Sequence, residues 1–319
     1  MPLQHVVISI GAIAVFVFAH EWLTLPLDDN SLASDLNAIR LAYDVDGIVD
    51  SKKSFTSADV ETYYSETTNR EYALLDYLFG SGMHTRLAGT QQAAYVMYQI
   101  ASIQAHTVLE VGAGKGHCAR WLASELPDVH FTALDLSSHV IISDIPNLAF
   151  VAGDATKLDS QKYDVIFGVE SLCHLDTQLK LLQFVQQATM KLNDDGLLVV
   201  IDGFRSAGFQ NASLDQQLAM QLAESGFKIR RMPSRLDWIS ACADSGLVLI
   251  EHLPLTSQAI PFWDFGWRIS RLLIRSASFV RWLSSVRPHT AANLLSVTTV
   301  AHALRDSGAA EYGMLVFMR

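Results

Sequence analysis

The chain has 319 residues, of which 50% are hydrophobic, and carries a formal net charge of −10 at pH 7. This length suits one large domain or two small ones, and half of the residues can contribute to a core. The acidic balance argues against a nucleic-acid substrate, because proteins that bind nucleic acids usually present a basic face. The 3 cysteines, Cys118, Cys173 and Cys242, are scattered without a CxxC pair. We therefore expect neither a disulfide framework nor a zinc site among the cysteines, and a cytoplasmic, reducing location.

An apolar run from Val6 to Ala19 lies near the N-terminus, broken only by Ser9. It is shorter than the roughly 20 residues of a membrane span, and it lacks the preceding basic residues of a signal peptide. Three interpretations stay open: a helix packed on the body, a helix packed against a second copy in a homodimer, and a membrane anchor or membrane-surface segment. Residues 28–57 suggest a connector or a weak helix pair. We assign residues 1–56 to this N-terminal segment and connector, and 57–319 to the main domain.

An amphipathic pattern over 57–79 follows, rich in tyrosine, and ends at the glycines before His84. Tyr72 and Tyr77 fit a core position on its apolar face. Residues 91–104 form a second amphipathic pattern that leads into the first predicted strand. The core of the main domain is expected to begin at about residue 104.

A strand, a glycine turn and a helix are predicted over 107–122. The apolar run 108–111 is followed by Gly112, Gly114 and Gly116, which allow the backbone to approach a ligand closely. The helix N-terminus behind them offers free N–H groups. A dinucleotide-binding loop requires G-x-G-x-x-G, and His117 stands where the third glycine would be, which counts against NAD. With Glu110 two residues before the first glycine, this stretch resembles motif I of the class I S-adenosylmethionine (SAM) methyltransferases.

The next predicted strands carry acidic residues in register with that motif. A strand over 131–134 ends in Asp135, at the distance from the glycines that suits a carboxylate binding two ribose hydroxyls. A strand over 149–152 is followed by Asp154, which the resemblance implies holds the adenine amino group. The predicted cofactor is SAM, and its candidate ligands here are Glu110, Gly112, Gly114, Gly116, Asp135, Leu136, Asp154 and Ala155.

Further strands are expected over 163–169, 196–201, 247–252 and 311–319, with helices over 177–192, 214–223 and 236–244. This order predicts an α/β, Rossmann-like, seven-stranded doubly wound sheet with helices on both faces. Insertions over about 203–235 and 253–310 are expected to form an α-helical lid. The resemblance to the methyltransferases covers roughly 60–319.

The fourth predicted strand runs into Glu170, at the sheet edge where open α/β sheets bind ligands. The Asn/Asp-Pro-Pro-Tyr tetrad of one class of N- and O-methyltransferases is absent. Glu170, Ser171 and His174 instead resemble the Glu-Ala/Ser-x-x-His segment of sterol and tocopherol C-methyltransferases. Prenyl diphosphate C-methyltransferases share the Glu-Ser start, and both groups methylate carbon.

A carboxylate at position 170 suits this chemistry, because methylating an alkene carbon produces a carbocation. An ionised Glu170 would stabilise that charge and could then accept the proton. His174 follows one helical turn later and could face the same ligand. The alternative is structural: Glu170 caps the following helix and His174 packs. The resemblance also implies that Tyr64 and His84 close over SAM and substrate, whereas the alternative makes these side chains core aromatics.

Two basic or aromatic stretches are candidates for the acceptor site. One stretch of eight residues in this acidic chain contains four cationic side chains: Lys228, Arg230, Arg231 and Arg235. Such a run is usually a solvated face, but arginines also bind diphosphates well, and Mg²⁺ often bridges phosphates to protein. Residues 261–268 resemble the Pro-aromatic-Trp-acidic segment of prenyl diphosphate C-methyltransferases. The predicted acceptor-binding residues are His84, Arg230, Arg231, Arg235, Phe262, Trp263 and Trp267.

A basic amphipathic helix is predicted over 269–283, where aliphatic residues alternate with arginines. A substrate lid, a membrane-surface helix and an ordinary packed helix are all compatible with this pattern. The expected function is C-methylation of a small lipophilic isoprenoid, with a prenyl diphosphate as first choice and cyclisation of the cation as an option. Methylation of a sterol, quinone or other natural product at carbon or oxygen is the alternative within the enzymes. A catalytically inactive SAM-fold partner subunit is the alternative outside them.

Overall fold

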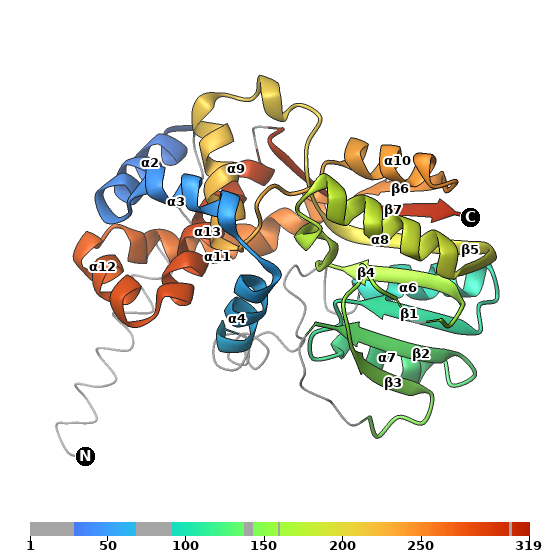
Figure 1. Ribbon diagram of the computed structural model, residues 1–319. Coiled ribbons are helices and arrows are strands. Elements are labelled where there is room, and N and C mark those ends of the chain that lie inside the picture. The colour runs from blue at the N-terminus through green and yellow to red at the C-terminus, as the bar shows by residue number, and fades with distance from the viewer. Residues whose placement is uncertain (1–28, 68–90, 137–142, 159, 306–307) are drawn as a thin grey trace, which may run out of the picture.

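The computed structural model describes residues 29–67, 91–136, 143–158, 160–305 and 308–319. Its centre is a 7-stranded sheet with the order β3-β2-β1-β4-β5-β7-β6 (Figure 1). Strand β7 is antiparallel to β5 and β6, and the other pairs are parallel. This confirms the predicted Rossmann-like sheet. The strands are β1 (Thr107–Val111), β2 (His130–Asp135), β3 (Leu148–Ala152), β4 (Tyr163–Val169), β5 (Leu192–Arg205), β6 (Val248–Pro254) and β7 (Ala310–Met318).

The order of the parallel strands places the candidate site. Strand β1 pairs with β2 on one side and with β4 on the other, so the chain reverses its direction of winding between β1 and β4. In open α/β sheets such a reversal leaves a crevice at the carboxyl ends of the strands. Asp135 ends β2 and Glu170 follows β4 directly, so both predicted residues lie at this edge.

Helices cover both faces of the sheet (Figure 1). On one face lie α6 (Gln91–Ser102) and α7 (His117–Glu125), and on the other α8 (Gln178–Lys191) and α10 (Arg235–Asp244). Helix α8 buries Leu181, Phe184, Val185 and Ala188, the i, i+3, i+4, i+7 spacing of a helix with one apolar face. These side chains share a core with α10 and β4, whereas α6 and α7 belong to the core on the opposite face.

A helical body stands beside the sheet (Figure 1). It contains α2 (Asp29–Ala42), α3 (Val45–Ser51), the 3₁₀ helix η1 (Lys52–Ser54), α4 (Ser57–Thr67), α9 (Leu214–Gly226), α11 (Thr256–Ile274), α12 (Ala277–Val286) and α13 (Pro288–Leu304). The expected helix pair over 28–57 is confirmed as α2 and α3. Leu36 and Ile39 of α2 share one core with Val280 and Leu283 of α12. The segment before residue 57 is therefore an integral part of the helical body.

The single basic helix predicted over 269–283 is wrong in its boundaries. Helix α11 begins much earlier, at Thr256, and ends at Ile274, and α12 begins at Ala277. The side chain of Ser276 accepts a hydrogen bond from the Phe279 N–H and caps α12. Serine is among the preferred N-cap residues because its hydroxyl satisfies a free N–H of the first turn, so a new helix starts there.

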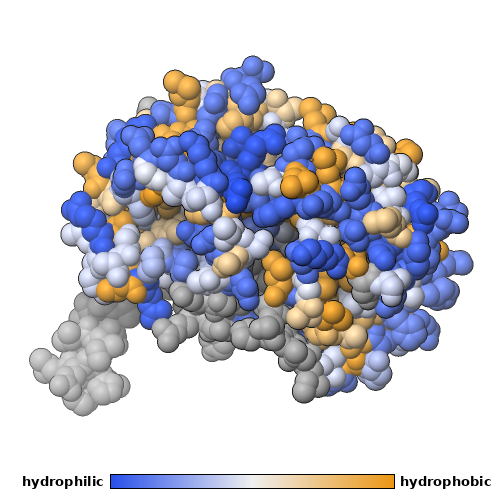
Figure 2. Space-filling view, viewed as in Figure 1, coloured by the Kyte–Doolittle hydropathy of each residue, from blue (hydrophilic) through white to orange (hydrophobic). Residues whose placement is uncertain are grey.

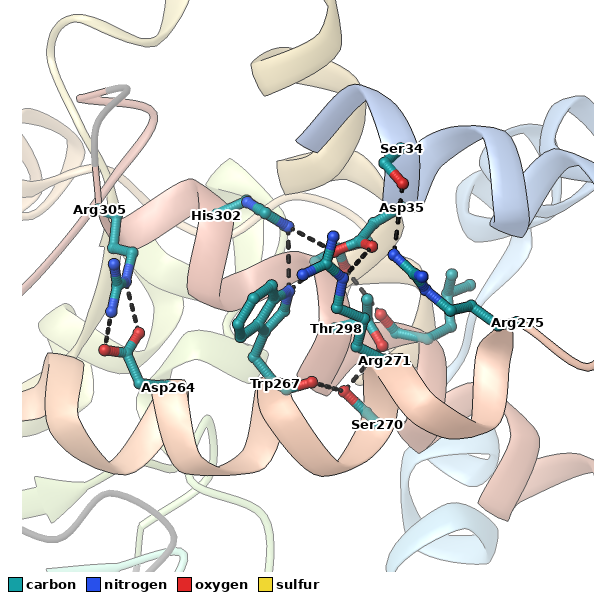
Figure 3. Close-up of polar contacts among 12 residues, drawn as sticks. Ser34, Asp35, Asp264, Trp267, Ser270, Arg271, Arg275, Thr298, His302 and Arg305 are labelled. Atoms are coloured by element: carbon teal, nitrogen blue, oxygen red, sulfur yellow. Dashed lines mark hydrogen bonds and ion pairs between the residues drawn. The ribbon is translucent and has the colours of Figure 1, made fainter. Parts of the chain in front are cut away.

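A buried polar network joins α2 to α11 and α13 (Figure 3). The carboxylate of Asp35 accepts hydrogen bonds from Trp267 Nε1 at 2.8 Å and from Arg271 Nε at 2.8 Å. His302 Nε2 lies 3.0 Å from the same carboxylate. Because Asp35 is almost fully buried, these partners compensate for the loss of its hydration and tie the three helices together.

Hydrophilic side chains cover much of the face seen in Figure 2, with smaller hydrophobic groups between them. Within the described ranges, none of the helices has the length and apolar character that crossing a membrane requires. The apolar run 6–19 lies outside the described residues.

Candidate active site

The glycine loop after β1 lies against the end of β2. The N–H groups of Gly112 and Ala113 donate to the carbonyl of Leu134 at 2.8 and 3.0 Å. The N–H of Gly114 donates to Oδ2 of Asp135 at 2.7 Å. Gly114 has φ +54°, and a Cβ built on it would meet no atom within 4 Å, so this residue faces open space. The structure thus brings together the loop and the acidic residue that the sequence predicted.

The other two glycines of the loop serve packing. A Cβ on Gly112 would lie 2.3 Å from the Cβ of Ser171, the residue after Glu170. The Ser171 hydroxyl donates to the carbonyl of Val111 at 2.6 Å and joins the loops that follow β1 and β4. Gly116 is the N-cap of α7, and a Cβ there would overlap the ring of Phe150 on β3. Of the three glycines, Gly114 alone has open space where a Cβ would stand.

Glu110 lies beneath this loop, inside the protein. Its carboxyl group accepts a hydrogen bond from the Ala119 N–H in the first turn of α7. Burial, with a smaller contribution from the charge of Asp135, raises its pKa to about 8. Oε2 of Glu110 has no hydrogen-bond partner among the described residues. Glu110 therefore supports the loop and α7 from below, a role that its cofactor-binding prediction did not include.

The substitution Glu110→Gln should make the free energy of unfolding less sensitive to pH. In the unfolded chain the pKa is near 4.5, so as pH rises from about 4.5 to 8 the unfolded state loses a proton that the folded state keeps. This lowers the free energy of unfolding of the wild type by about 1.4 kcal/mol per pH unit in that window. The variant lacks this loss, so its stability relative to wild type should increase by roughly 3 to 5 kcal/mol across the window. Urea unfolding at several pH values measures it, with the exposed Glu125→Gln as control. A difference that stays constant with pH would contradict the prediction.

Glu170 stands at the carboxyl end of β4 in a left-handed backbone conformation, with φ +51°. Non-glycine residues seldom adopt it, and such strain persists only where the surroundings enforce it. Oε1 of Glu170 accepts hydrogen bonds from the hydroxyl of Tyr312 at 2.7 Å and from Nε2 of Gln92 at 2.9 Å. Ser171 is the N-cap of the following 3₁₀ helix, η3 (Leu172–His174). The carboxylate therefore meets α6 and β7, and the alternative of a simple helix cap does not describe it.

Gln92 and Tyr312 were not predicted as site residues. Both are buried, and Gln92 Nε2 also lies 3.1 Å from the Tyr312 hydroxyl, so the two donors and the carboxylate form a triangle. Gln92 could have been noticed as a polar residue on the apolar face of α6, beside Ala93 and Val96. Tyr312 carried no signal of its own, because a tyrosine at the start of a terminal strand is ordinary core composition.

His174 pairs with Tyr64, a contact between two predicted site residues that was not itself predicted. The Tyr64 hydroxyl lies 2.9 Å from His174 Nε2, and the two rings meet edge to face. Tyr64 belongs to α4, so this contact links the helical body to the loop after β4. His84, which was predicted to bind the acceptor, lies outside the described residues.

A second buried carboxylate, Asp202, supports this loop and was not predicted. It lies on β5, and its two oxygens accept hydrogen bonds from the N–H groups of Cys173 and Gly203, each at 2.8 Å. Burial raises its pKa to about 6. Because Cys173 is the middle residue of η3, Asp202 fixes the position of the segment between Glu170 and His174.

The three predicted diphosphate-binding arginines have partners inside the protein. Arg230 Nε donates to the carbonyl of Phe55 at 2.6 Å. Arg231 pairs with Asp237 at 2.9 Å, and Arg235 with Glu311 at 3.1 Å. These contacts give each guanidinium a structural role within the helical body or at α10, so the structure does not gather the three arginines around one anion.

The three predicted aromatic residues of α11 differ in their surroundings. Phe262 and Trp263 stack edge to face at 5.4 Å, and Trp263 also meets Phe227. Both Phe262 and Trp263 are partly exposed, and Trp263 packs against the core that contains Tyr312. Trp267 is buried in the Asp35 network instead (Figure 3). Phe262 and Trp263 thus remain candidates for the acceptor site, whereas Trp267 serves the helical body.

Two solved structures show how widely this fold is used. The [4+2]-cyclase SpnF superposes with a TM-score of 0.58 at 17% identity, covering 83% of this chain and 96% of that one. Geranyl diphosphate C-methyltransferase from Streptomyces coelicolor A3(2) gives a TM-score of 0.53 at 18% identity, covering 72% of this chain and 77% of that one. Both similarities concern the fold.

Sequence relatives decide the family. A family model described as a methyltransferase domain matches residues 109–198. The tRNA (guanine-N(7)-)-methyltransferase of Brevibacillus brevis is 30% identical over 154 residues, which cover 45% of this chain and 72% of that protein. The chain belongs to the class I SAM-dependent methyltransferases. The (S)-tetrahydroprotoberberine N-methyltransferase of Eschscholzia californica is 26% identical over 183 residues, covering 50% of this chain and only 51% of that protein.

The residues of this methyltransferase fit SAM. The open Gly114 leaves room for a ligand beside the half-buried Asp135. Leu136 offers an exposed apolar side chain next to Asp135, and Asp154 and Ala155 follow β3 at the same sheet edge. Asp154 Oδ1 accepts hydrogen bonds from the N–H and hydroxyl of Thr156, which fix the carboxylate in place. When bound, SAM supplies an electrophilic methyl group; Asp135 would hold its ribose and Asp154 its adenine.

Proposed function

We propose that this methyltransferase methylates a carbon atom of a lipophilic isoprenoid acceptor, with a prenyl diphosphate as the first acceptor to test. The observation that carries the proposal is the carboxylate of Glu170, oriented by Tyr312 and Gln92 at the end of β4. The same sheet edge carries the glycine loop and Asp135, which fit SAM. A fixed negative charge beside the transferred methyl group is what an alkene acceptor requires.

The chemistry of an alkene acceptor gives Glu170 two consecutive tasks. The π electrons of the double bond would form the new carbon–carbon bond to the methyl group while the S–CH₃ bond of SAM breaks and its electron pair leaves on the sulfur of S-adenosylhomocysteine; the neighbouring carbon would then carry the positive charge as a carbocation. Glu170 stabilises this cation electrostatically. It then accepts a proton from the adjacent carbon, and the electrons of that C–H bond restore a double bond. If no proton is lost, the cation can instead be attacked by another double bond of the acceptor, which closes a ring.

The partly exposed rings of Phe262 and Trp263 support an apolar acceptor and could also stabilise a cation through their faces. The case for a diphosphate acceptor is weaker than the case for an apolar one, because the arginines predicted to bind it have partners inside the protein: Arg230, Arg231 and Arg235. Among the described residues, no group of three or more His, Cys, Asp or Glu side chains could hold a metal. We therefore expect Mg²⁺ to be required only if the acceptor is a diphosphate, whose phosphate oxygens would help to hold it.

An amine acceptor is the second candidate, favoured by the similarity to an N-methyltransferase. Methylation of a tertiary amine also creates a cation, in this case a quaternary ammonium, which Glu170 would stabilise. The two candidates differ in one respect: carbon methylation ends with loss of a proton to a base, and quaternisation of an amine does not.

The direct test is incubation with methyl-labelled SAM and a panel of acceptors: geranyl and farnesyl diphosphate with and without Mg²⁺, a sterol, and a tertiary amine. We expect label in a product of one isoprenoid, with the new methyl group on carbon by mass and NMR analysis. Label on nitrogen would establish the amine candidate. SAM binding by calorimetry without turnover of any acceptor would favour a non-catalytic partner subunit.

A further inference from the structure

The helices α11 and α12 carry apolar side chains on two opposite faces. Their inner faces contribute Ile274, Val280 and Leu283 to the core of the helical body. Their outer faces expose Ile269 (45%), Leu272 (43%) and Leu273 (39%) on α11, and Trp282 (57%) and Val286 (54%) on α12. On α11 these residues follow the i, i+3, i+4 spacing of one helical face, opposite the buried Trp267 and Ile274. We call these five exposed residues the outer face.

The charged residues of the segment that carries the outer face are all cationic. Residues 265–287 contain 5 arginines and no aspartate or glutamate, although the whole chain has a net charge of −10. Asp35 neutralises Arg271 from α2. Arg281 and Arg287 are exposed beside Trp282 and Val286 on α12. Apolar and cationic side chains side by side on the surface of a helix suit the interface of an anionic lipid bilayer.

The position of the N-terminal apolar run favours a membrane as the occupant. The first half of α2 lies against the second half of α11, through Ser34 with Arg275 and Asp35 with Arg271 (Figure 3). Only nine residues, 20–28, separate the apolar run 6–19 from the start of α2. Nine residues span at most about 30 Å, so the run is tethered within that distance of the start of α2. The exposed Leu41 (72%), whose carbonyl accepts from Arg281, extends the same surface onto α2.

We propose that the outer face binds the surface of an anionic lipid membrane. Helix α12 lies at the end of the helical body away from β6 and the C-terminus (Figure 1), so the sheet would point away from the bilayer. Trp282 and its apolar neighbours would enter the boundary between headgroups and acyl chains, while Arg281 and Arg287 meet the lipid phosphates. This surface is independent of the identity of the methyl acceptor.

Co-sedimentation of the full chain with two kinds of vesicle tests the proposal: equal parts phosphatidylglycerol and phosphatidylcholine, and phosphatidylcholine alone. We expect binding to the anionic vesicles that weakens as salt is added. The double variant Arg281→Gln, Arg287→Gln should lose about fivefold in partitioning per arginine. Trp282→Glu should lose at least about tenfold, because it removes a large apolar side chain from the bilayer boundary.

Matched controls lie on the sheet side of the molecule. Leu179 on α8 is 65% exposed, so Leu179→Glu introduces the same charge at an apolar position that is at least as exposed as Trp282. Lys162→Gln with Lys191→Gln removes the same number of charges. These variants should bind vesicles as the wild type does, and all variants should retain wild-type thermal unfolding. Binding that survives Trp282→Glu unchanged would show that another segment, such as residues 6–19 alone, carries it and would overturn the proposal. The proposal would also be overturned if the wild type did not bind vesicles and instead formed a homodimer that Trp282→Glu dissociates. A second copy of the chain, and not a membrane, would then cover the outer face.

Discussion

Replacing Glu170 with glutamine should lower kcat for the accepted substrate about 10²-fold or more and leave SAM affinity nearly unchanged. Glutamine keeps the size of the side chain and can still accept hydrogen bonds from Tyr312 and Gln92, so the geometry of the site should survive. Only the negative charge and the capacity to accept a proton are lost. Steady-state kinetics with calorimetry of SAM binding separates the two effects.

The structure offers a closely matched control. Glu251 on β6 accepts a hydrogen bond at 2.8 Å from Gln99, on the same helix α6 that supplies Gln92 to Glu170. Glu251→Gln makes the same chemical change away from the carboxyl ends of the strands and should leave kcat unchanged. Wild-type turnover by Glu170→Gln would refute the carboxylate mechanism and favour a transfer that needs neither charge nor base, such as simple O-methylation.

Tyr312→Phe extends this test to the orientation of the carboxylate. Removing the hydroxyl takes away one of the two described donors to Oε1 of Glu170, so kcat should fall by less than in Glu170→Gln. In the double variant the two losses should not add, because Tyr312 acts by orienting Glu170. Additive losses would instead assign Tyr312 an independent role.

Glu224→Gln should lower the free energy of unfolding by about 3–5 kcal/mol. Glu224 is fully buried on α9, and its carboxylate meets Arg205 through two contacts at 2.6 Å and Lys52 at 2.5 Å. It also accepts from the Met232 N–H at 2.9 Å. Neutralising it leaves two nearly buried cations without a counter-charge, which is the costly way to break a buried ion pair. Urea unfolding followed by circular dichroism measures the loss.

Glu311→Gln is the control for this prediction. Glu311 pairs with Arg235, and both side chains are about a quarter exposed, so water screens the pair and its loss should cost about 0–1 kcal/mol. If Glu224→Gln does not fold, Lys52→Met provides a second measurement. It leaves the bidentate pair of Glu224 with Arg205 intact and should cost clearly less than 3 kcal/mol. Equal losses in Glu224→Gln and Glu311→Gln would show that the buried cluster does not stabilise the fold as argued.

The sequence alone determined the architecture of the sheet and the edge at which the site lies. Buried parallel strands appear as short apolar runs, so β1, β2 and β4 could be recognised locally. Once those strands are parallel, their carboxyl ends meet at one edge, which brings the glycine loop, Asp135 and Glu170 together without knowledge of any side-chain contact. The break between α11 and α12 was not predicted, because the amphipathic pattern continues across Ser276, the residue that caps α12.

Only the tertiary structure decided which partners these residues have. Gln92 and Tyr312 lie 220 residues apart in the chain and meet at Glu170 because α6 packs on β4 and β7 pairs with the neighbouring strand β5. The arginines of 230–235 look alike in the sequence, yet each finds a different partner, and Trp267 is drawn into the Asp35 network. The physical reason is the same in each case: a polar side chain that becomes buried must be satisfied by whichever group the packing places beside it, and packing depends on the whole chain.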